Sequence, residues 1–332
     1  RQIAATMEFA SGGKFHREYK VLLDDIIKSA ADRIKLNIAN GMWVQKDFTF
    51  LDSYFDPVKK NYGSPITKVD FKVPGEREIA RQEINGWVEE KTSHKITNLL
   101  SPGDLNDSTR LVLVNAIYFY GQWADTFHRD ATRPDDFLLA RGAIVKVPFM
   151  RNGGRYNYYK DSKIRALEIP YKDNKASMIL FLPVENEGIS KFEKTFGYTY
   201  YNDILSAFQS SEVQLILPKF KTEYHVQLAS TLSGLGMPLA FDKHHADFSG
   251  MTGSRELCIS KVIHQALIEV DEKGTEAAAA TAVVMDILSV APHAHSDVVV
   301  FKADHPFIFI IRDNATGAIL FMGRVMDPGR EG

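Results

Sequence analysis

Cysteine is scarce in this sequence, because its 332 residues contain a single one, Cys258. One cysteine excludes an internal disulfide framework, so the fold must be stabilised by its core. That core can be large, since 45% of the residues are hydrophobic and 11% are aromatic, and one large domain fits this length as well as two small ones. Cys258 lies in the mostly apolar run ELCISKVIHQALIEV, so we expect a buried strand thiol.

The chain also lacks an excess of charge of either sign and any long apolar run. Lys plus Arg total 40 and Asp plus Glu total 42, which leaves a formal net charge of -2. This balance does not give the broad basic field that phosphate backbones attract, so we expect no nucleic-acid partner. No apolar run approaches the roughly 18 to 20 residues of a membrane-spanning helix, so we expect no membrane partner.

A recognisable signal peptide is missing as well, because residues 1–13 show no basic stretch followed by an apolar core. The chain begins inside a helical pattern, so this absence carries little weight. Asn106 and Asn314 each begin an Asn-x-Ser/Thr triplet that fits the acceptor pattern for N-glycosylation. From these two sites we expect an extracellular, secreted glycoprotein.

The local signatures of common enzymes are absent from the sequence: it contains no GxxxxGK[ST], GxGxxG, GxSxG or HExxH. Two histidine clusters are the remaining candidates for a metal site, His293 and His295 with Asp297, and His244 and His245 near Asp247. Each cluster has two imidazoles and a carboxylate, which are suitable ligands for a divalent ion. Nothing in the sequence fixes their geometry, so we expect solvated loops, no metal site and no enzyme.

Hydrophobic periodicity predicts several helices near the front of the chain and sheets behind them. Apolar residues at helical spacing indicate helices over 2–9, 14–30, 51–62, 76–96 and 189–208. Strand patterns cover 33–44, several short runs between 145 and 182, and 213–226, 257–270, 298–313 and 317–325. Segment 111–120 (LVLVNAIYFY) is apolar almost throughout, as expected for a central strand buried on both faces. We therefore predict one mixed α+β domain.

Segment 272–288 (EKGTEAAAATAVVMDIL) is the most unusual stretch, because its local preferences contradict each other. Its four consecutive alanines favour a helix, whereas Thr281, Val283 and Val284 favour a strand. If the segment is extended from Thr275, the face made by Thr275, Ala277, Ala279, Thr281, Val283 and Met285 is wholly uncharged, and its small side chains allow it to enter between existing strands. An ordinary alanine-rich helix and a surface loop remain open as alternatives.

The same segment resembles the hinge of the reactive-centre loop in inhibitory serpins. Further resemblances follow in chain order: LVLVNAIYFYGQW is similar to the central strand of sheet A, LPKFKTEY and ISKVIHQA to strands next to the hinge, and ADHPFIFIIRDNATGAILFMGRV to the C-terminal signature. This resemblance implies the α+β serpin fold, with several helices at the front around three β-sheets, a large central sheet A and an exposed reactive-centre loop at about 272–297. We expect 1–332 to be a single serpin domain from which N-terminal helices of the family are missing.

The resemblance also implies roles for single residues. Asn115 and His264 match the polar shutter pair beneath the opening of sheet A, and Trp123 matches the breach tryptophan. Lys219 and Glu272 match the breach ion pair, although they could also form a surface pair that contributes little. The hinge corresponds to Glu272, Gly274, Thr275, Glu276, Ala277, Ala278, Ala279 and Ala280.

The mechanism implied by the resemblance is inhibition of a serine protease, which is the covalent partner, by a monomeric inhibitor. The protease cuts the loop, and the loop inserts into sheet A while the acyl link persists. By the usual count of the family, the reactive bond follows the fourteenth residue after Gly274 and joins Leu288 to Ser289. A leucine there suits an apolar, chymotrypsin- or elastase-like pocket. The stretch after Ser289 is longer than usual, so cleavage near Val290 or at Met285 stays open, as does a non-inhibitory carrier or chaperone.

No cofactor is required by this mechanism. A glycosaminoglycan remains a possible partner because basic residues gather on or beside one predicted helix. Asp24 and Asp25 on the same helix reduce its positive charge. These basic residues are Lys14, His16, Arg17, Lys20 and Lys28.

Overall fold

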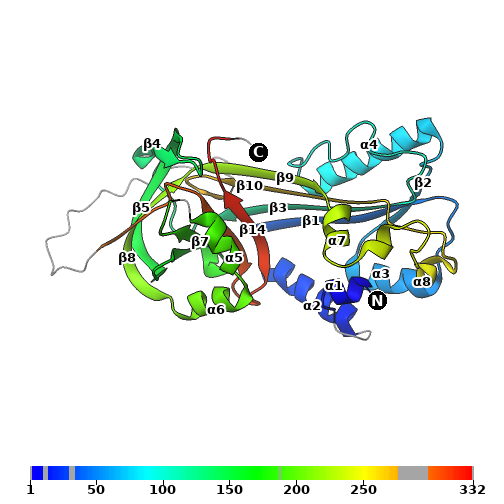
Figure 1. Ribbon diagram of the computed structural model, residues 1–332, viewed down its shortest axis with the longest axis horizontal. Helices are drawn as coiled ribbons and strands as arrows, with labels where there is room; N and C mark the ends of the chain where they lie inside the picture. Colours follow the sequence, from blue (N-terminus) through cyan, green and yellow to red (C-terminus); the bar gives the residue numbers. More distant parts are fainter. Residues whose placement is uncertain (1, 10–13, 30–33, 187, 276–297, 331–332) are drawn as a thin grey trace. The chain divides into compact units, whose positions relative to one another are not determined.

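The computed structural model of the chain (Figure 1) describes residues 2–9, 14–29, 34–186, 188–275 and 298–330. Its contacts divide the chain into two compact units. Unit 1 comprises Arg1–Lys28, Lys35–Phe119 and Glu223–Leu267, and unit 2 comprises Ser29–Ile34, Tyr120–Thr222 and Ile268–Gly332. The division falls inside the strands β3 (Leu111–Gln122), β9 (Phe220–Gln227) and β10 (Lys261–Val270), and after the first residue of β1 (Ile34–Gln45).

Unit 1 combines most of a sheet with short and medium helices. Its further strands are β1 (Ile34–Gln45) and β2 (Ile66–Val69). Its helices are α1 (Gln2–Thr6), α2 (Lys14–Ser29), α3 (Asp52–Tyr62), α4 (Pro74–Lys91), α7 (Ala229–Gly234), α8 (Ser249–Thr252) and the 3-10 helix η3 (Pro238–Phe241). β1 and β2 run parallel, and β3 and β10 pair directly and in parallel from Val112 with Lys261 to Tyr118 with Leu267.

Two hydrophobic cores cover opposite faces of the unit 1 sheet, because successive side chains of a strand point to opposite sides. Val112, Val114 and Ala116 of β3 pack with residues of α4 in one core. Leu111 and Leu113 of the same strand pack in the other core with residues of α3, α7 and α8. Figure 1 accordingly shows α4 on one side of β1 and β3 and the other helices of this unit on the opposite side.

Unit 2 is built around a second sheet, in the order β12-β8-β5-β6-β7-β13-β14, with β4 paired to β5. The strands are β4 (Arg133–Leu138), β5 (Ile144–Lys160), β6 (Ile164–Pro170), β7 (Ala176–Pro183), β8 (Gln209–Pro218), β12 (Val299–Lys302), β13 (Phe307–Asp313) and β14 (Ile319–Val325). Helices α5 (Ile189–Thr195) and α6 (Tyr198–Ser206) pack on β7 and β13 through one apolar cluster. The 3-10 helices η1 (Arg129–Ala131) and η2 (Lys172–Asn174) lie in connections.

The first sheet has the order β2-β1-β3-β11-β10-β9. β3 is thus an inner strand, and its long apolar sequence agrees with the expected central position. β11 (Gly274–Thr275) is a strand of only two residues. It lies in unit 2, where it separates the ends of β3 and β10.

The predicted α+β architecture is confirmed, with differences of detail. Where three sheets were expected, hydrogen bonding joins the described strands into two, because the 17-residue strand β5 pairs with β4, β6 and β8 along its length. The single run predicted over 298–313 forms two strands, β12 and β13. The expected strand position of Cys258 is wrong, because pairing with β3 begins only at Lys261, and the thiol is half-buried.

Candidate functional site

The hinge begins with a tight turn that reverses the chain after β10. The Asp271 backbone N–H donates to the carbonyl of Gly274 at 2.8 Å. The Asp271 carboxylate accepts backbone hydrogen bonds from Lys273 at 2.9 Å and from Gly274 at 3.3 Å. Such side-chain-to-backbone bonds favour a turn. The turn places Thr275 opposite Val270, so that β11 runs antiparallel to β10.

Gly274 approaches the backbone of β3 so closely that no other residue fits. β11 pairs antiparallel with β3, Gly274 with Gln122 and Thr275 with Gly121. A Cβ atom added to Gly274 would lie 2.0 Å from the carbonyl oxygen of Gly121. A glycine is therefore required for this backbone contact. Thr275, the next residue, is fully buried at 0% exposure.

An aromatic pair lies beside this buried threonine. The rings of Trp123 and Tyr171 stack with centroids 4.6 Å apart and an interplanar angle of 10°. The indole Nε1 of Trp123 donates to the carbonyl of Asp271 at 2.9 Å. The hydroxyl oxygens of Tyr171 and Thr275 lie 2.8 Å apart and share a hydrogen bond. Burial raises the pKa of Tyr171 well above its usual value, so the hydroxyl keeps its proton.

Tyr171 was missed by the sequence analysis, whereas Trp123 was singled out. The signal in the sequence is weak: Tyr171 ends the run IRALEIPY, where a tyrosine is an ordinary core residue. Its contact with the hinge joins it to a residue 104 positions away in the chain.

Glu272 forms a buried charged contact in the same turn. Its side chain is 6% exposed, and its Oε2 lies 2.9 Å from Nζ of Lys219. The Thr132 hydroxyl donates to its other carboxylate oxygen at 2.9 Å. Burial by itself would raise the pKa of Glu272, but the hydrogen bonds from Lys219 and Thr132 hold the pKa below its usual value. The ion pair expected between Lys219 and Glu272 is present, and its role in loop insertion stays a prediction.

Asn115 and His264 lie directly opposite each other on β3 and β10 in unit 1. Nδ1 of His264 lies 2.6 Å from Oδ1 of Asn115, and Nδ2 of Asn115 donates to Oδ1 of Asn40 at 2.6 Å. These three side chains form an amide row, Asn40, Asn115 and His264, that links β1, β3 and β10. All three are half-buried. Burial lowers the pKa of His264, so the ring is neutral near pH 7.

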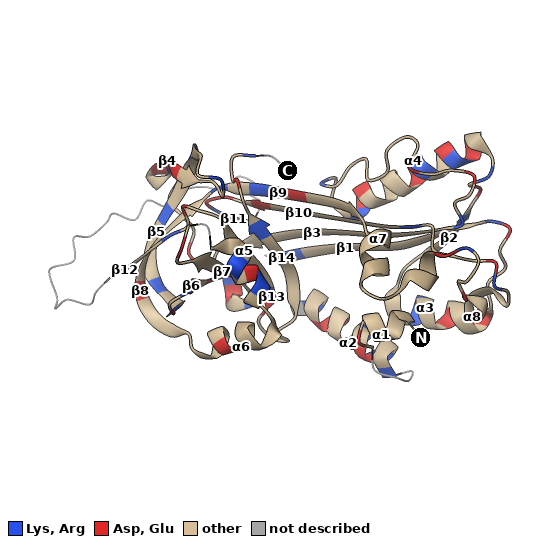
Figure 2. Cartoon of the chain, viewed as in Figure 1, with Lys and Arg blue, Asp and Glu red and all other residues tan. Residues whose placement is uncertain are grey.

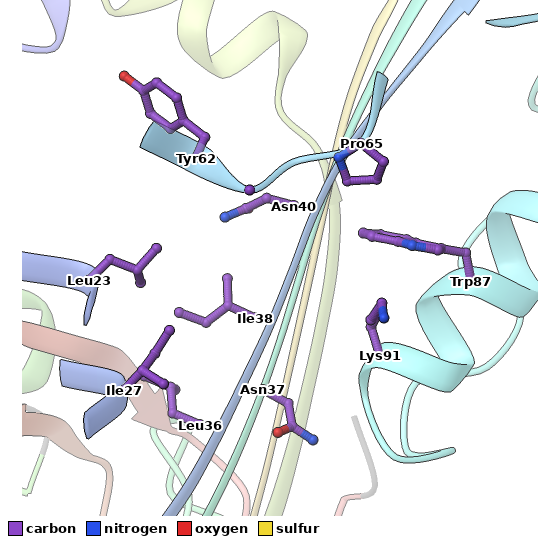
Figure 3. Close-up of a pocket in the computed structure, with 11 residues that line it drawn as sticks. Leu23, Ile27, Leu36, Asn37, Ile38, Asn40, Tyr62, Pro65, Trp87 and Lys91 are labelled. Carbon is purple, nitrogen blue, oxygen red and sulfur yellow. The ribbon is translucent and has the colours of Figure 1, made fainter. Parts of the chain in front are cut away.

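Two cavities of unit 1 reach the amide row. One, of about 580 Å³, lies between α2, β1 and α4, and Figure 3 shows Asn40 among its lining residues with Leu23, Ile38 and Trp87. The other, of about 440 Å³, is lined by both Asn40 and Asn115. The row therefore borders two pockets.

Several predicted residues fall outside the described part of the chain. They are Glu276, Ala277, Ala278, Ala279, Ala280, Met285, Leu288, Ser289, Val290, His293, His295 and Asp297. The reactive bond and most of the hinge assignment therefore stay predictions.

The second histidine cluster is described, and its members His245 and Asp247 are engaged by other side chains of the protein. His245 Nδ1 lies 2.8 Å from a carboxylate oxygen of Asp242, and Arg255 pairs with Asp247 at 3.0 Å. In the part of the chain that the structure describes, no group of three or more His, Cys, Asp or Glu side chains has the arrangement of a metal site. The described helices also include none that is long and apolar enough to cross a membrane.

The basic residues proposed for a glycosaminoglycan lie on α2 together with acidic ones. Figure 2 shows both signs of charge on this helix. Lys20 and Asp24 form an exposed ion pair at 3.0 Å, and Nδ1 of His16 lies 2.6 Å from the hydroxyl of Tyr62. A glycosaminoglycan partner stays a prediction.

Known proteins are similar to this chain over nearly its whole length. A family model described as Serpin (serine protease inhibitor) matches residues 1–328. A leukocyte elastase inhibitor of Xenopus laevis is 39% identical over 333 residues, covering 98% of this chain and 86% of that protein. Serpin B4 of Homo sapiens is 40% identical over 329 residues, covering 98% and 82%. Serpin48 of the insect Tenebrio molitor has a similar solved structure, with a TM-score of 0.85, 33% identity and coverage of 98% and 84%.

The relatives overturn the expectation of an extracellular, secreted glycoprotein. Leukocyte elastase inhibitor and Serpins B3 and B4 are intracellular serpins without signal peptides, so that expectation is wrong. An Asn-x-Ser/Thr triplet arises often by chance and becomes a glycosylation site only in a secreted chain. The side-chain amide of Asn314 is moreover engaged, because it donates to the Ser177 hydroxyl at 2.8 Å and to the Asn174 carbonyl at 3.0 Å. Asn106 is exposed and accepts a hydrogen bond from the Ser108 backbone at 3.0 Å.

The curated relatives carry the names of inhibitors and serpins, in agreement with the expected inhibitory function and not with an enzyme. The family model spans nearly the whole chain, and relatives near 40% identity cover 98% of it. The chain therefore belongs to the serpin family of serine protease inhibitors.

Proposed function

We propose that the protein inhibits a serine protease as a suicide substrate, and that residues 1–332 act as one serpin domain in a monomer. The observation that carries this proposal is β11. Gly274 and Thr275 already lie between the ends of β3 and β10, and the turn before them is hydrogen-bonded through Asp271. The chain that follows Thr275 can extend this strand.

Extension of β11 would replace the direct pairing of β3 with β10. In the intact protein, Val112–Tyr118 pair with Lys261–Leu267. A strand inserted between them pairs its backbone on both sides, so each residue adds hydrogen bonds and buried surface. Small, uncharged hinge residues such as Ala277 and Ala279 enter such a gap with little steric cost. This gain in stability drives the conformational change.

The covalent step takes place in the loop. The protease serine Oγ attacks the carbonyl carbon of Leu288, the peptide bond to Ser289 breaks, and the new amine of Ser289 takes the proton from the protease histidine. The product is an ester between Leu288 and the protease. Hydrolysis of this ester releases active protease, so inhibition requires that insertion is faster than hydrolysis.

The proposed targets are elastase- or chymotrypsin-like proteases. The leucine at 288 fits an apolar specificity pocket. The relatives from Xenopus laevis and Homo sapiens that are named leukocyte elastase inhibitor support the same class. We propose no cofactor for this reaction.

Incubation with elastase, chymotrypsin and trypsin tests this function. We expect a band that survives boiling in detergent with the first two proteases, formed faster than with trypsin, and a released fragment that begins at Ser289. Leu288→Arg should reverse the preference toward trypsin. Cleavage of the loop without any stable complex would contradict the inhibitory function, and a fragment with another first residue would contradict only the position of the bond.

A further inference from the structure

The hydroxyl of Tyr171 contacts the buried end of the hinge. Tyr171 directly follows β6 and forms an isolated β-bridge with Trp123. Both Tyr171 and Thr275 are 0% exposed, and their hydroxyl oxygens are 2.8 Å apart. Among the described residues, Tyr171 is the hydrogen-bond partner found for the Thr275 hydroxyl.

Because both residues are buried, the contact depends on which polar groups the two side chains carry. Water does not reach a fully buried hydroxyl, and a buried hydroxyl that loses its partner is strongly disfavoured. Loss of the Tyr171 hydroxyl would therefore disfavour the buried position of Thr275 between β3 and β10. Two apolar side chains of the same shape would also be compatible with each other, because neither would then have an unmet hydrogen bond.

The tyrosine ring has a second contact besides the one with the Thr275 side chain. It stacks on Trp123, whose backbone N–H donates to the Lys273 carbonyl at 3.0 Å and whose indole donates to the Asp271 carbonyl at 2.9 Å. Trp123 is 1% exposed. The hydroxyl of Tyr171 is therefore presented at a fixed position next to the turn, before any further part of the loop enters the sheet.

We propose that Tyr171 is a positioning residue for loop insertion: its hydroxyl holds Thr275 between β3 and β10 in the intact protein, so that the new strand already has its first residues. Insertion then proceeds from an ordered end, which lowers the entropy that must be lost after cleavage. This inference rests on the proposed function, because a positioned hinge affects inhibition only if the loop inserts.

A double-mutant cycle in the intact protein tests the contact directly. Tyr171→Phe and Thr275→Val each remove one hydroxyl, and the double variant removes both. Hydrogen exchange of the backbone amides in 270–275 reports local opening of the hinge. We expect exchange about tenfold faster in each single variant and a return close to the wild-type rate in the double variant. Tyr200→Phe is the matched control, because it removes a hydroxyl that donates to Asp161 at 2.7 Å, outside the hinge.

The stoichiometry of inhibition gives a second measurement on the same variants. Each single variant should consume more inhibitor per protease than the wild type, and the double variant should recover. Equal hinge exchange in Tyr171→Phe and Tyr200→Phe would overturn the positioning role, and so would a double variant that opens as fast as the single ones. A wild-type protein that never traps protease would instead contradict the proposed function, since the exchange cycle requires no protease.

Discussion

The turn at Glu272–Thr275 and the amide row of Asn40, Asn115 and His264 both link β3 to β10, but they are built from different chemistry. At the turn, Thr275 and Tyr171 are fully buried, the Glu272 carboxylate is charged and paired, and Gly274 lies against bare backbone. In the amide row, three half-buried side chains are joined by single hydrogen bonds beside cavities. At the turn, β11 lies between β3 and β10, whereas the amide row holds the two strands directly together.

The difference matters because the two contacts have opposite tasks in the proposed mechanism. A hydrogen bond between half-buried side chains contributes only about 1 kcal/mol, so the amide row can open without a large barrier. A buried charge or hydroxyl without a partner costs more, so the turn is disrupted only when its partners are removed. The predictions below test this difference, from the largest effect to the smallest.

Cleavage of the loop should have the largest effect on stability. If about ten residues join the sheet and each adds about 0.5–1.5 kcal/mol of hydrogen bonding, the free energy of unfolding rises by roughly 10 kcal/mol. The melting temperature should then rise by more than about 10 °C. Calorimetry of intact and elastase-cut protein measures this change. Equal melting curves would show that the cut chain does not extend β11.

Thr275→Arg should abolish trapping and leave cleavage intact. The guanidinium would be buried at a 0% exposed position without a partner charge, which costs several kcal/mol even after relaxation. Since about 1.4 kcal/mol changes a rate tenfold, insertion should become slower than hydrolysis of the ester. Stoichiometry of inhibition is the measurement, and the exposed Thr195→Arg is the control. A Thr275→Arg protein that still traps protease one to one would contradict the insertion mechanism.

Lys219→Met should destabilise the protein by about 1–2 kcal/mol at pH 7, because it leaves the buried Glu272 carboxylate without its positively charged partner. The folded-state pKa of Glu272 is lowered, so its contribution to stability is present above the unfolded-state pKa and is lost as the pH falls through the folded-state value. The variant should therefore lose less stability on acidification than the wild type. Urea midpoints of the variant and the wild type at several pH values measure this difference in pH dependence.

The matched control for Lys219→Met is Lys191→Met. Lys191 pairs with Glu185 at 2.8 Å, but both side chains are largely exposed. This substitution should shift the urea midpoint little. Equal shifts in the two variants would mean that burial of Glu272 does not strengthen its ion pair.

Asn40→Ala should have the smallest effect, a loss of about 1 kcal/mol in the free energy of unfolding. It removes the acceptor for Asn115 and weakens the amide row, so a synthetic peptide with the sequence of residues 275–288 should enter the sheet faster. Asn37→Ala is the control on the same strand, because Asn37 donates to the Ser93 hydroxyl at 2.8 Å and not to β3. A slower or unchanged uptake in Asn40→Ala would contradict the role of the row in holding β3 and β10 together.

Much of the fold was predictable from local patterns. The helix expected over 51–62 agrees with α3 at Asp52–Tyr62, and the strand over 111–120 agrees with β3 at Leu111–Gln122. The helix expected over 76–96 ends earlier, at Lys91, because the buried Thr92 and the turn after it lead into apolar residues that pack in the core without helical spacing. The helix over 189–208 divides at Gly197 into α5 and α6.

The candidate site was predictable only in part. Asn115 with His264 and Lys219 with Glu272 were paired by resemblance, and the structure brings each pair within hydrogen-bonding distance. Asn40 and Tyr171 were not predicted. An asparagine in a strand and a tyrosine at the end of one are common residues, and nothing near them in the sequence indicates which polar group they meet.

By itself, the amino-acid sequence determined the α+β composition, the central position of β3 and the small, uncharged character of the hinge, because periodicity and side-chain size act between near neighbours in the chain. Only the tertiary structure decided that Thr275 would be buried against Tyr171 and that Gly274 would lie on Gly121. Those contacts join residues more than 100 positions apart, and they depend on strand register and on the stacking of Trp123, which are set by packing of the whole unit and not by any local pattern.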